Sequence, residues 1–350
     1  MLSMTMEEWK EVLAQWKEPA FRAKQIFDWL HKKHVTEIND MSNLPKALRE
    51  KLKQNGKIAG VKQVKKRVSE VDGTIKYLFE IENGFVIESV LMRYHYGNTA
   101  CISTQAGCRM GCRFCASTLN GVERNLTAGE MLSQVYEIQK EIGERVSGVV
   151  LMGSGEPLDN YDNVLKFLHL VNNENGICLG QRHITLSTCG LVEKMYELLE
   201  ENLQITLAVS LHAPNDNIRK TIMPVANKYC MEELLKVCKK YSDTTKRRIT
   251  LEYALIKGVN DSDVCAVELA GKLHHMLCHV NLIPVNDVKE RNYRKSSEEQ
   301  VQKFAQILED RGVDVTVRRK LGSDIDAACG QLRRRYQDLG DTVPNPPASL

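Results

Sequence analysis

The first 70 residues place aromatic side chains between charged ones at the spacing of an α-helix. We expect these aromatics to form the core of a small helical domain whose lysines keep its surface solvated. They are Trp9, Trp16, Phe21, Phe27 and Trp29. His31 and His34 stand among lysines and are expected on an exposed face of a helix.

The hydrophobic pattern changes over residues 71–98, where apolar and polar positions alternate with period two. Lys76 to Ile81 and Phe85 to Met92 carry the alternation, and Asp72-Gly73 and Asn83-Gly84 supply turn signals beside them. This segment is predicted to be an extension of short antiparallel strands.

Beyond residue 98, short β-branched runs alternate with segments of helical periodicity. Apolar strands that alternate with helices predict an α/β fold with a parallel sheet, open or closed as a partial barrel, over residues 99–335. Chemistry in such folds gathers on loops at the carboxyl ends of the strands. The tail, residues 336–350, is expected to be disordered. The expected strands are Thr99 to Thr104, Gly148 to Met152, His183 to Thr188, Ile205 to Leu211, Arg248 to Tyr253 and His279 to Ile283, and helices are expected over Ala128 to Ile142, Tyr161 to Val171 and Met231 to Tyr241.

Composition indicates the class of protein and the compartment to expect. The chain has 350 residues, 48 Lys and Arg against 45 Asp and Glu, and 43% hydrophobic residues, as is usual for a globular enzyme. No apolar run approaches the length of a transmembrane helix, and the N-terminus carries acidic residues where a secretory signal has a basic start and an apolar core. We therefore expect a cytoplasmic protein without a membrane partner.

Charge is distributed unevenly along the chain. Residues 1–70 hold 15 Lys and Arg but only 9 Asp and Glu, which leaves the remainder slightly acidic. Two interpretations stay open: ordinary solvated lysines, or an accessory domain that contacts the phosphates of a nucleic acid.

The eleven cysteines do not indicate a disulfide framework, because their number is odd and disulfides rarely persist in the cytoplasm. Cys108, Cys112 and Cys115 have the spacing C-x3-C-x2-C in a loop after a predicted strand. Zinc is one interpretation, although structural zinc prefers four ligands. A [4Fe-4S] cluster held by three thiolates is the other, and it leaves one iron open to another ligand.

This loop, with Phe114 before its last cysteine, resembles the signature of radical S-adenosylmethionine (SAM) enzymes. In that superfamily the open iron binds SAM, reductive cleavage of SAM gives a 5′-deoxyadenosyl radical, and the usual scaffold is a partial (β/α)6 barrel. Further segments resemble, in order, the RlmN/Cfr family of adenine-methylating enzymes, over nearly the whole chain. They are Cys101-Ile-Ser-Thr-Gln-Ala-Gly-Cys108, Gly153-Ser-Gly-Glu-Pro-Leu158, Ser187-Thr-Cys-Gly190, Ser210-Leu-His-Ala-Pro-Asn-Asp216, Asn281-Leu-Ile-Pro-Val-Asn286 and Gly322-Ser-Asp-Ile-Asp-Ala-Ala-Cys-Gly-Gln331.

The resemblance implies methylation of carbon 2 of an adenine in 23S rRNA and also in tRNA. By motif, Cys329 would carry the methyl group, Cys101 would resolve the RNA adduct by forming a transient disulfide, and Glu88 would accept the proton. Two SAM molecules are then used per turnover, one to methylate Cys329 and one to form the radical. An external electron donor, such as a flavodoxin or ferredoxin, is implied as well, and we expect a monomer.

The resemblance also implies a set of SAM contacts, namely Gly155, Glu156, Ser187, Ser210, Leu211, His212 and Asn286. Ser154 and Cys189 depart from the methionine and serine that are common in the family, which puts specificity rather than chemistry in doubt. Pro157 favours the carbon-2 branch, and Cfr-type methylation of carbon 8 is the alternative. A zinc-bound RNA-binding module is the alternative without catalysis.

Overall fold

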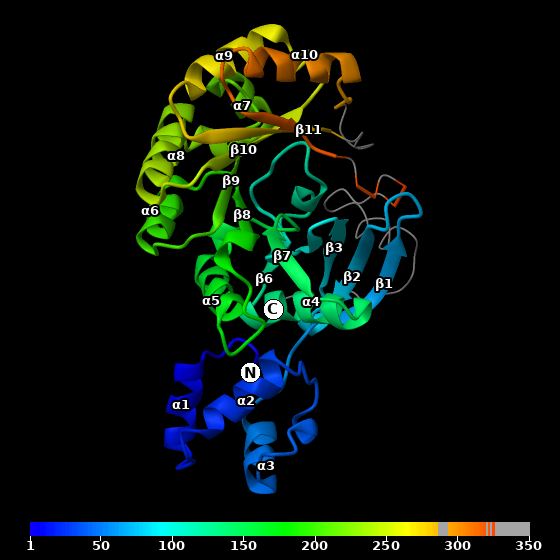
Figure 1. Cartoon of the computed structure of the whole chain (residues 1–350), viewed down its shortest axis with the longest axis vertical. Coiled ribbons are helices and arrows are strands. Elements are labelled where there is room, and N and C mark those ends of the chain that lie inside the picture. Colours follow the sequence, from blue (N-terminus) through cyan, green and yellow to red (C-terminus); the bar gives the residue numbers. More distant parts are fainter. Residues whose placement is uncertain (286–292, 320, 323, 326–350) are drawn as a thin grey trace.

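The computed structural model describes residues 1–285, 293–319, 321–322 and 324–325. A small lobe of three helices, α1 (Met6–Gln15), α2 (Arg22–His31) and α3 (Lys46–Asn55), precedes the rest of the chain (Figure 1). The predicted helical domain is therefore present, and Trp9 and Phe27 lie in its core. Phe21, which the pattern also assigned to the core, is 60% exposed.

The strand extension is antiparallel, as the period-two pattern predicts. β1 (Lys62–Val68), β2 (Ile75–Glu80), β3 (Val86–Tyr94) and β4 (Gly97–Cys101) pair in this order. Residues 62–68 were expected within the helical domain, but β1 is the edge strand of the sheet. Its lysines suit that place, because charged side chains on an edge strand oppose pairing with other chains.

Parallel strands continue the same sheet. From β4 the order runs through β7 (Val146–Leu151), β8 (Ile184–Thr188), β9 (Thr206–Ser210), β10 (Ile249–Leu255), β11 (Cys278–Pro284) and the short β12 (Val315–Val317). Each of these strands is parallel to its neighbours. In the described part of the chain β12 pairs only with β11, so the sheet there is a curved, open barrel.

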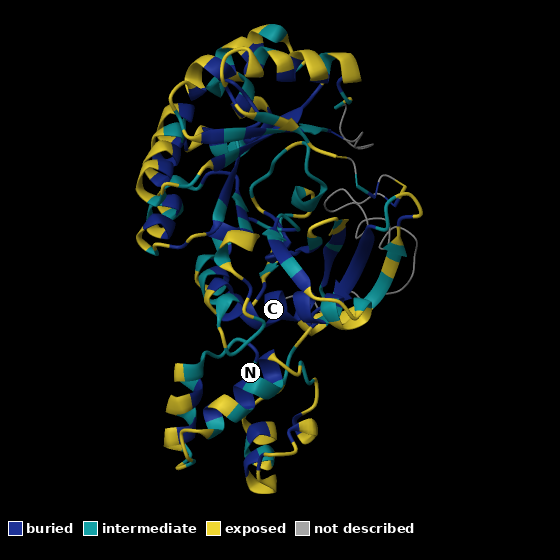
Figure 2. Ribbon diagram, viewed as in Figure 1, coloured by how far each residue is buried: buried dark blue, intermediate teal, exposed yellow. Residues whose placement is uncertain are grey.

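Helices cover the outside of this sheet (Figure 1). They are α4 (Ala128–Ile142), α5 (Tyr161–Asn172), α6 (Val192–Glu200), α7 (Asp216–Ile222), α8 (Met231–Thr245), α9 (Asp263–Leu273) and α10 (Glu298–Glu309). Figure 2 shows the strands largely buried and the exposed residues gathered on the outer faces of the helices. The predicted alternation of strand and helix is thus confirmed. Within the described ranges, no helix combines the length and apolarity needed to cross a membrane.

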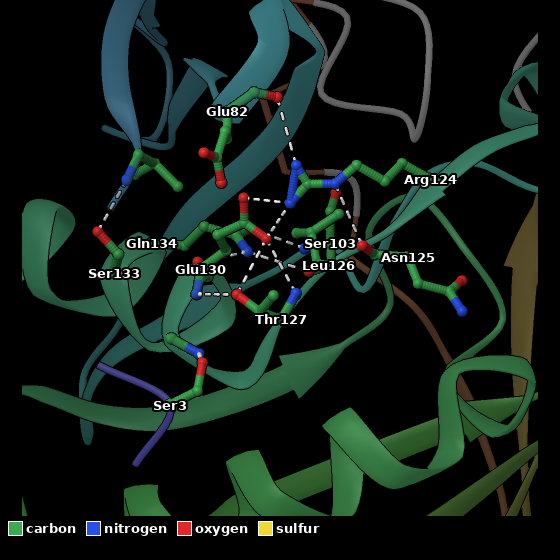
Figure 3. A network of polar contacts seen from close by, with 12 residues as sticks. Ser3, Glu82, Ser103, Arg124, Asn125, Leu126, Thr127, Glu130, Ser133 and Gln134 are labelled. Carbon is green, nitrogen blue, oxygen red and sulfur yellow. Dashed lines mark hydrogen bonds and ion pairs between the residues drawn. The ribbon is translucent and has the colours of Figure 1, made fainter. Parts of the chain in front are cut away.

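A polar network at the start of α4 joins several parts of the chain (Figure 3). Arg124, on β6 (Val122–Asn125), donates to both carboxylate oxygens of Glu130, while the Thr127 hydroxyl accepts the Glu130 N–H and caps the helix. The Gly129 N–H donates to Ser3 Oγ at 2.8 Å. The network therefore ties the N-terminal segment to the first helix of the barrel.

His31 forms a second contact between the helical lobe and α4. Contrary to the expectation of an exposed histidine, His31 is fully buried, and its Nδ1 lies 2.9 Å from the Tyr136 hydroxyl. The His34 ring stacks on the same tyrosine, with ring centroids 4.1 Å apart. Burial lowers the pKa of His31 to about 3, so this histidine is neutral in the folded chain. Sequence could not reveal this contact, because the partner lies 105 residues away.

Candidate active site

The cysteine loop follows β5 (Gln105–Gly107), which pairs with β6 in a separate two-stranded sheet, and it is wound tightly. The Cys108 N–H donates to the Gly121 carbonyl at 2.8 Å. Gly107 has φ +76°, and a Cβ there would collide with the same carbonyl, so only glycine fits. The Thr118 hydroxyl donates to the carbonyls of Cys112 and Cys115, at 3.1 and 2.9 Å. These bonds fix all three cysteines on one short loop.

The loop offers sulfur donors alone, which suits iron–sulfur or zinc ligation. Burial raises the pKa of the Cys108 thiol to about 12 and also raises that of Cys112, and the neighbouring thiols add to both shifts. Within the described residues, no three His, Cys, Asp or Glu side chains converge on a single ion. Three thiolates can each bind a different iron, so the donor set of this loop fits a [4Fe-4S] cluster.

The loop after β7 carries the next candidate residues. Gly155 has φ +107°, and a Cβ there would lie 2.7 Å from the Gln105 backbone nitrogen. The Ser154 N–H donates to Ser103 Oγ at 2.9 Å, and its carbonyl accepts the Gln105 N–H at 3.1 Å. The loop is therefore pressed against the segment that leads into the cysteine loop.

Glu156 is buried, and both of its carboxylate oxygens accept backbone hydrogen bonds. Oε1 accepts from the Leu158 N–H at 3.0 Å, and Oε2 accepts from the Cys189 N–H at 2.7 Å. Burial raises the pKa of this carboxyl, against the lowering effect of these donors. The side chain thus ties the β7 loop to the end of β8, and a direct contact of Glu156 with SAM stays a prediction.

Ser187 and Ser210 lie at the ends of β8 and β9, followed by buried Leu211 and His212. His212 Nδ1 accepts the Ala254 N–H at 2.9 Å, so its proton resides on Nε2. Burial lowers the pKa of His212 to about 3. Its ring meets the edge of Phe114 with centroids 4.8 Å apart, and this contact joins the cysteine loop to the end of β9.

Glu88 and Cys101 lie close together in the sheet. Cys101 pairs with Val90 across β3 and β4, and Glu88 is two residues from Val90 on the same face, so the two side chains are diagonal neighbours. Both are buried. Sequence reasoning missed the third member of this group, Lys76, which pairs with Val90 from β2 and lies fully buried beside Glu88.

Ser103 connects that group to the loop after β7. Its hydroxyl donates to the Glu88 carbonyl at 2.6 Å and accepts the Ser154 N–H. Its own backbone N–H and carbonyl both bond to the side-chain amide of Gln134 on α4, and the Ser89 hydroxyl donates to the same amide oxygen at 2.7 Å (Figure 3 shows Ser103 and Gln134). Ser103 thus links the backbone of Glu88 to the β7 loop.

A row of polar side chains lies across neighbouring strands from β9 to β12. The sequence did not predict it. Glu252 on β10 is aligned with Ser210 on β9 and Asn281 on β11, and Asn281 with Thr316 on β12. Aligned residues of parallel strands point to the same face. The Asn281 amide donates to Glu252 at 2.9 Å. A glutamate inside the otherwise apolar run Ile249 to Leu255 was the available signal.

Two expected site residues, Asn286 and Cys329, lie outside the described residues. Glu88 lies near the start of β3, and the others lie at the carboxyl ends of β4, β7, β8 and β9 and on the loop after β5. An open α/β barrel with a three-cysteine loop at this end defines the radical SAM class of enzymes, and the comparisons with known proteins agree.

Residues 102–269 match the family model described as the Radical SAM superfamily. Residues 1–58 match the N-terminal domain of ribosomal RNA large subunit methyltransferases. A crystal structure of a radical SAM methyltransferase from Sphaerobacter thermophilus superimposes with a TM-score of 0.90 at 43% identity, and the match covers 95% of this chain and 98% of that one.

Two curated relatives, both termed probable dual-specificity RNA methyltransferase RlmN, extend the comparison. The protein from Clostridium novyi (strain NT) is 58% identical over 96% of this chain and 98% of its own. The one from Clostridium botulinum (strain Eklund 17B / Type B) is 57% identical over 98% of both. The chain belongs to the RlmN family of SAM-dependent RNA methyltransferases. Its cofactors are accordingly a [4Fe-4S] cluster and SAM, in place of the zinc alternative.

Proposed function

We propose that this protein methylates carbon 2 of adenine in 23S rRNA and in tRNA. The N-terminal family model is described in terms of the large ribosomal RNA, and the curated relatives are termed dual-specificity RNA methyltransferases. Because those relatives are RlmN proteins, methylation of carbon 8 is not favoured.

Carbon 2 of adenine is electron-poor and its C–H bond is weakly acidic, so transfer of a methyl cation from a sulfonium is unfavourable there. When bound, the cluster and SAM supply the radical chemistry that this carbon requires. The protein then has to hold these groups, exclude water and remove one proton from carbon 2 before aromaticity returns.

Each of these tasks has a candidate residue. Cys108, Cys112 and Cys115 would hold the cluster, and the loops at the ends of β7, β8 and β9, with Asn286, would hold SAM. Glu88 would take the carbon-2 proton, because it is a buried carboxylate that lies near Cys101 on one face of the sheet. Cys329 would carry the methyl group, and Cys101 would close a disulfide with it as product leaves.

The observation that carries this proposal is the placement of Glu88 and Cys101 as diagonal neighbours on one face of the sheet. Proton removal and release of the adduct act on the same nucleotide, so their residues must reach it together. The register of β3 and β4 places them as diagonal neighbours, next to the segment that leads into the cysteine loop.

The test is nucleoside analysis of RNA by mass spectrometry. RNA from a strain that lacks the gene should lose 2-methyladenosine from 23S rRNA and tRNA, and expression of the chain should restore it. Restoration in rRNA alone would refute the tRNA part, and formation of 8-methyladenosine would refute the carbon-2 assignment.

Several partners and properties belong to the same proposal. An external flavodoxin or ferredoxin would supply electrons, the chain would act as a monomer in the cytoplasm, and the basic helical lobe would contact RNA phosphates. The lysines of α2 and its flank, Lys24, Lys32 and Lys33, are exposed and support the last point.

A further inference from the structure

A buried arginine contacts the loops that are proposed to bind SAM. Arg219, on α7, is fully buried, and within the described residues its guanidinium donates to four backbone carbonyls. The acceptors are Cys189 at 2.8 Å, Leu211 at 3.2 Å, and Ser210 and Tyr229 at 3.4 Å. Three of these carbonyls lie at the ends of β8 and β9, within or next to the segments that hold the candidate SAM contacts.

The peptide groups of Cys189 are fixed from two sides. Glu156 Oε2 accepts the Cys189 N–H at 2.7 Å, and Arg219 donates to the Cys189 carbonyl at 2.8 Å. Gly190, which follows, has φ +98° and turns the chain away from the sheet. The loops after β7, β8 and β9 are thereby joined through one residue and two buried side chains.

The same helix also contacts the cysteine loop. The Arg113 N–H, between Cys112 and Cys115, donates to the Ile222 carbonyl at the end of α7 at 2.8 Å. A Cβ on Gly111 would lie 3.3 Å from Pro224, just beyond that end. One turn of α7 separates this contact from Arg219, so the helix links the cluster-binding loop to the SAM-binding strand ends.

Arg219 is also a buried cation, and its charge has to be accounted for. In the described part of the chain, no carboxylate forms an ion pair with Arg219 within 4.0 Å. A buried cation without an anionic partner is costly. Burial lowers the pKa of Arg219, and the nearby thiols of Cys189 and Cys112 and the carboxylate of Asp216 act against that shift.

We propose that Arg219 is a positioning residue for SAM. It holds the ends of β8 and β9 in the conformation that receives SAM and, through α7, in register with the cluster-binding loop. The inference rests on the proposed function only in that SAM binds at these strand ends, and it does not depend on the RNA target.

The experiment measures SAM affinity of the anaerobically reconstituted, cluster-loaded chain by equilibrium dialysis, without RNA. Arg219→Met removes the guanidinium and its hydrogen bonds, and Arg219→Lys keeps the charge but cannot reach four carbonyls. We expect the dissociation constant for SAM to rise about tenfold or more in both variants, because the site is no longer preorganised. Iron content should stay at the wild-type level, since the cysteines are unchanged.

Arg247 supplies the matched control at the opposite end of β9. It donates to the Ile205 carbonyl and the Thr206 hydroxyl, both at 3.2 Å. Arg247→Met should leave SAM affinity unchanged, whatever its effect on the thermal midpoint of the cluster-free chain. Wild-type SAM affinity in cluster-loaded Arg219→Lys would overturn the proposal, and so would an equal loss in Arg247→Met. If Arg219→Met does not fold, Arg219→Lys decides alone.

Discussion

The ammonium of Lys76 lies 3.6 Å from a carboxylate oxygen of Glu88, and both side chains are buried. β2 and β3 place them diagonally across the sheet, and Cys101 lies on β4, the next strand after that of Glu88. An ion pair between two buried side chains restrains both of them, because breaking it would leave a buried charge without its partner. Lys76 therefore holds the Glu88 carboxylate in position beside Cys101.

Replacement of Lys76 by methionine should slow RNA methylation by about tenfold or more, because the Glu88 carboxylate loses the ion pair that holds it in position. Breaking a buried ion pair should also lower the free energy of unfolding by about 3 kcal/mol. Single-turnover methylation assays with the cluster-loaded variant, together with denaturant unfolding, measure the two effects.

Lys66 gives the comparison for that experiment, since it lies in an exposed ion pair with Glu141. Lys66→Met should change stability by less than about 1 kcal/mol and leave methylation unchanged. Wild-type methylation by Lys76→Met would contradict the role given to the pair.

Each of the three loop cysteines should be required for iron. Alanine at Cys108, Cys112 or Cys115 should abolish the brown colour of the anaerobic protein and reduce its iron content to background. A cluster held by only three thiolates is not retained when one of these ligands is removed. Cys178→Ala serves as control, since that cysteine is exposed and outside the loop. Iron assays and visible spectra measure the result, and full iron in any of the three loop variants would refute the ligand assignment.

The sequence predicted the parts of the site that are local in the chain. The spacing of the three cysteines and the strand-to-loop transitions at Ser187 and Ser210 can be read within a few residues. Helix α4 was predicted with its observed bounds, because its periodicity is regular and Thr127 and Glu130 form a capping box.

The sequence did not predict features that depend on which strands are neighbours. Nothing in the sequence marks Lys76 or Arg219 as buried, and only the sheet register and the packing of α7 show that both are. Likewise, Lys62 to Arg67 read as part of a basic domain, since edge strands carry charges that imitate a solvated helix face. Long-range contacts, which decide burial, leave no mark in a single sequence.

Cys101→Ala should stop the reaction after RNA has become attached to the protein, because no second thiol is available to release the adduct. A slow-migrating protein–RNA band on a denaturing gel is the expected result. The double variant with Cys329→Ala should lose the band, whereas Cys238→Ala, at a cysteine buried in α8, should turn over normally. Normal product release by Cys101→Ala would exclude the resolving role.

Acid should weaken the junction between the helical lobe and α4 through His31. Its pKa is about 3 in the folded chain against 6.5 as the ordinary value. Below pH 6.5 the unfolded chain therefore binds a proton that the folded chain does not, and stability falls as pH decreases. The slope approaches about 1.4 kcal/mol per pH unit for one histidine.

His31→Gln keeps a polar partner for Tyr136 but cannot titrate, so its unfolding free energy should fall less between pH 7 and pH 5. Urea unfolding of the cluster-free chain measures this, with the exposed His169→Gln as a control that should retain the wild-type slope. An unchanged slope in His31→Gln would show that this buried histidine does not couple folding to pH.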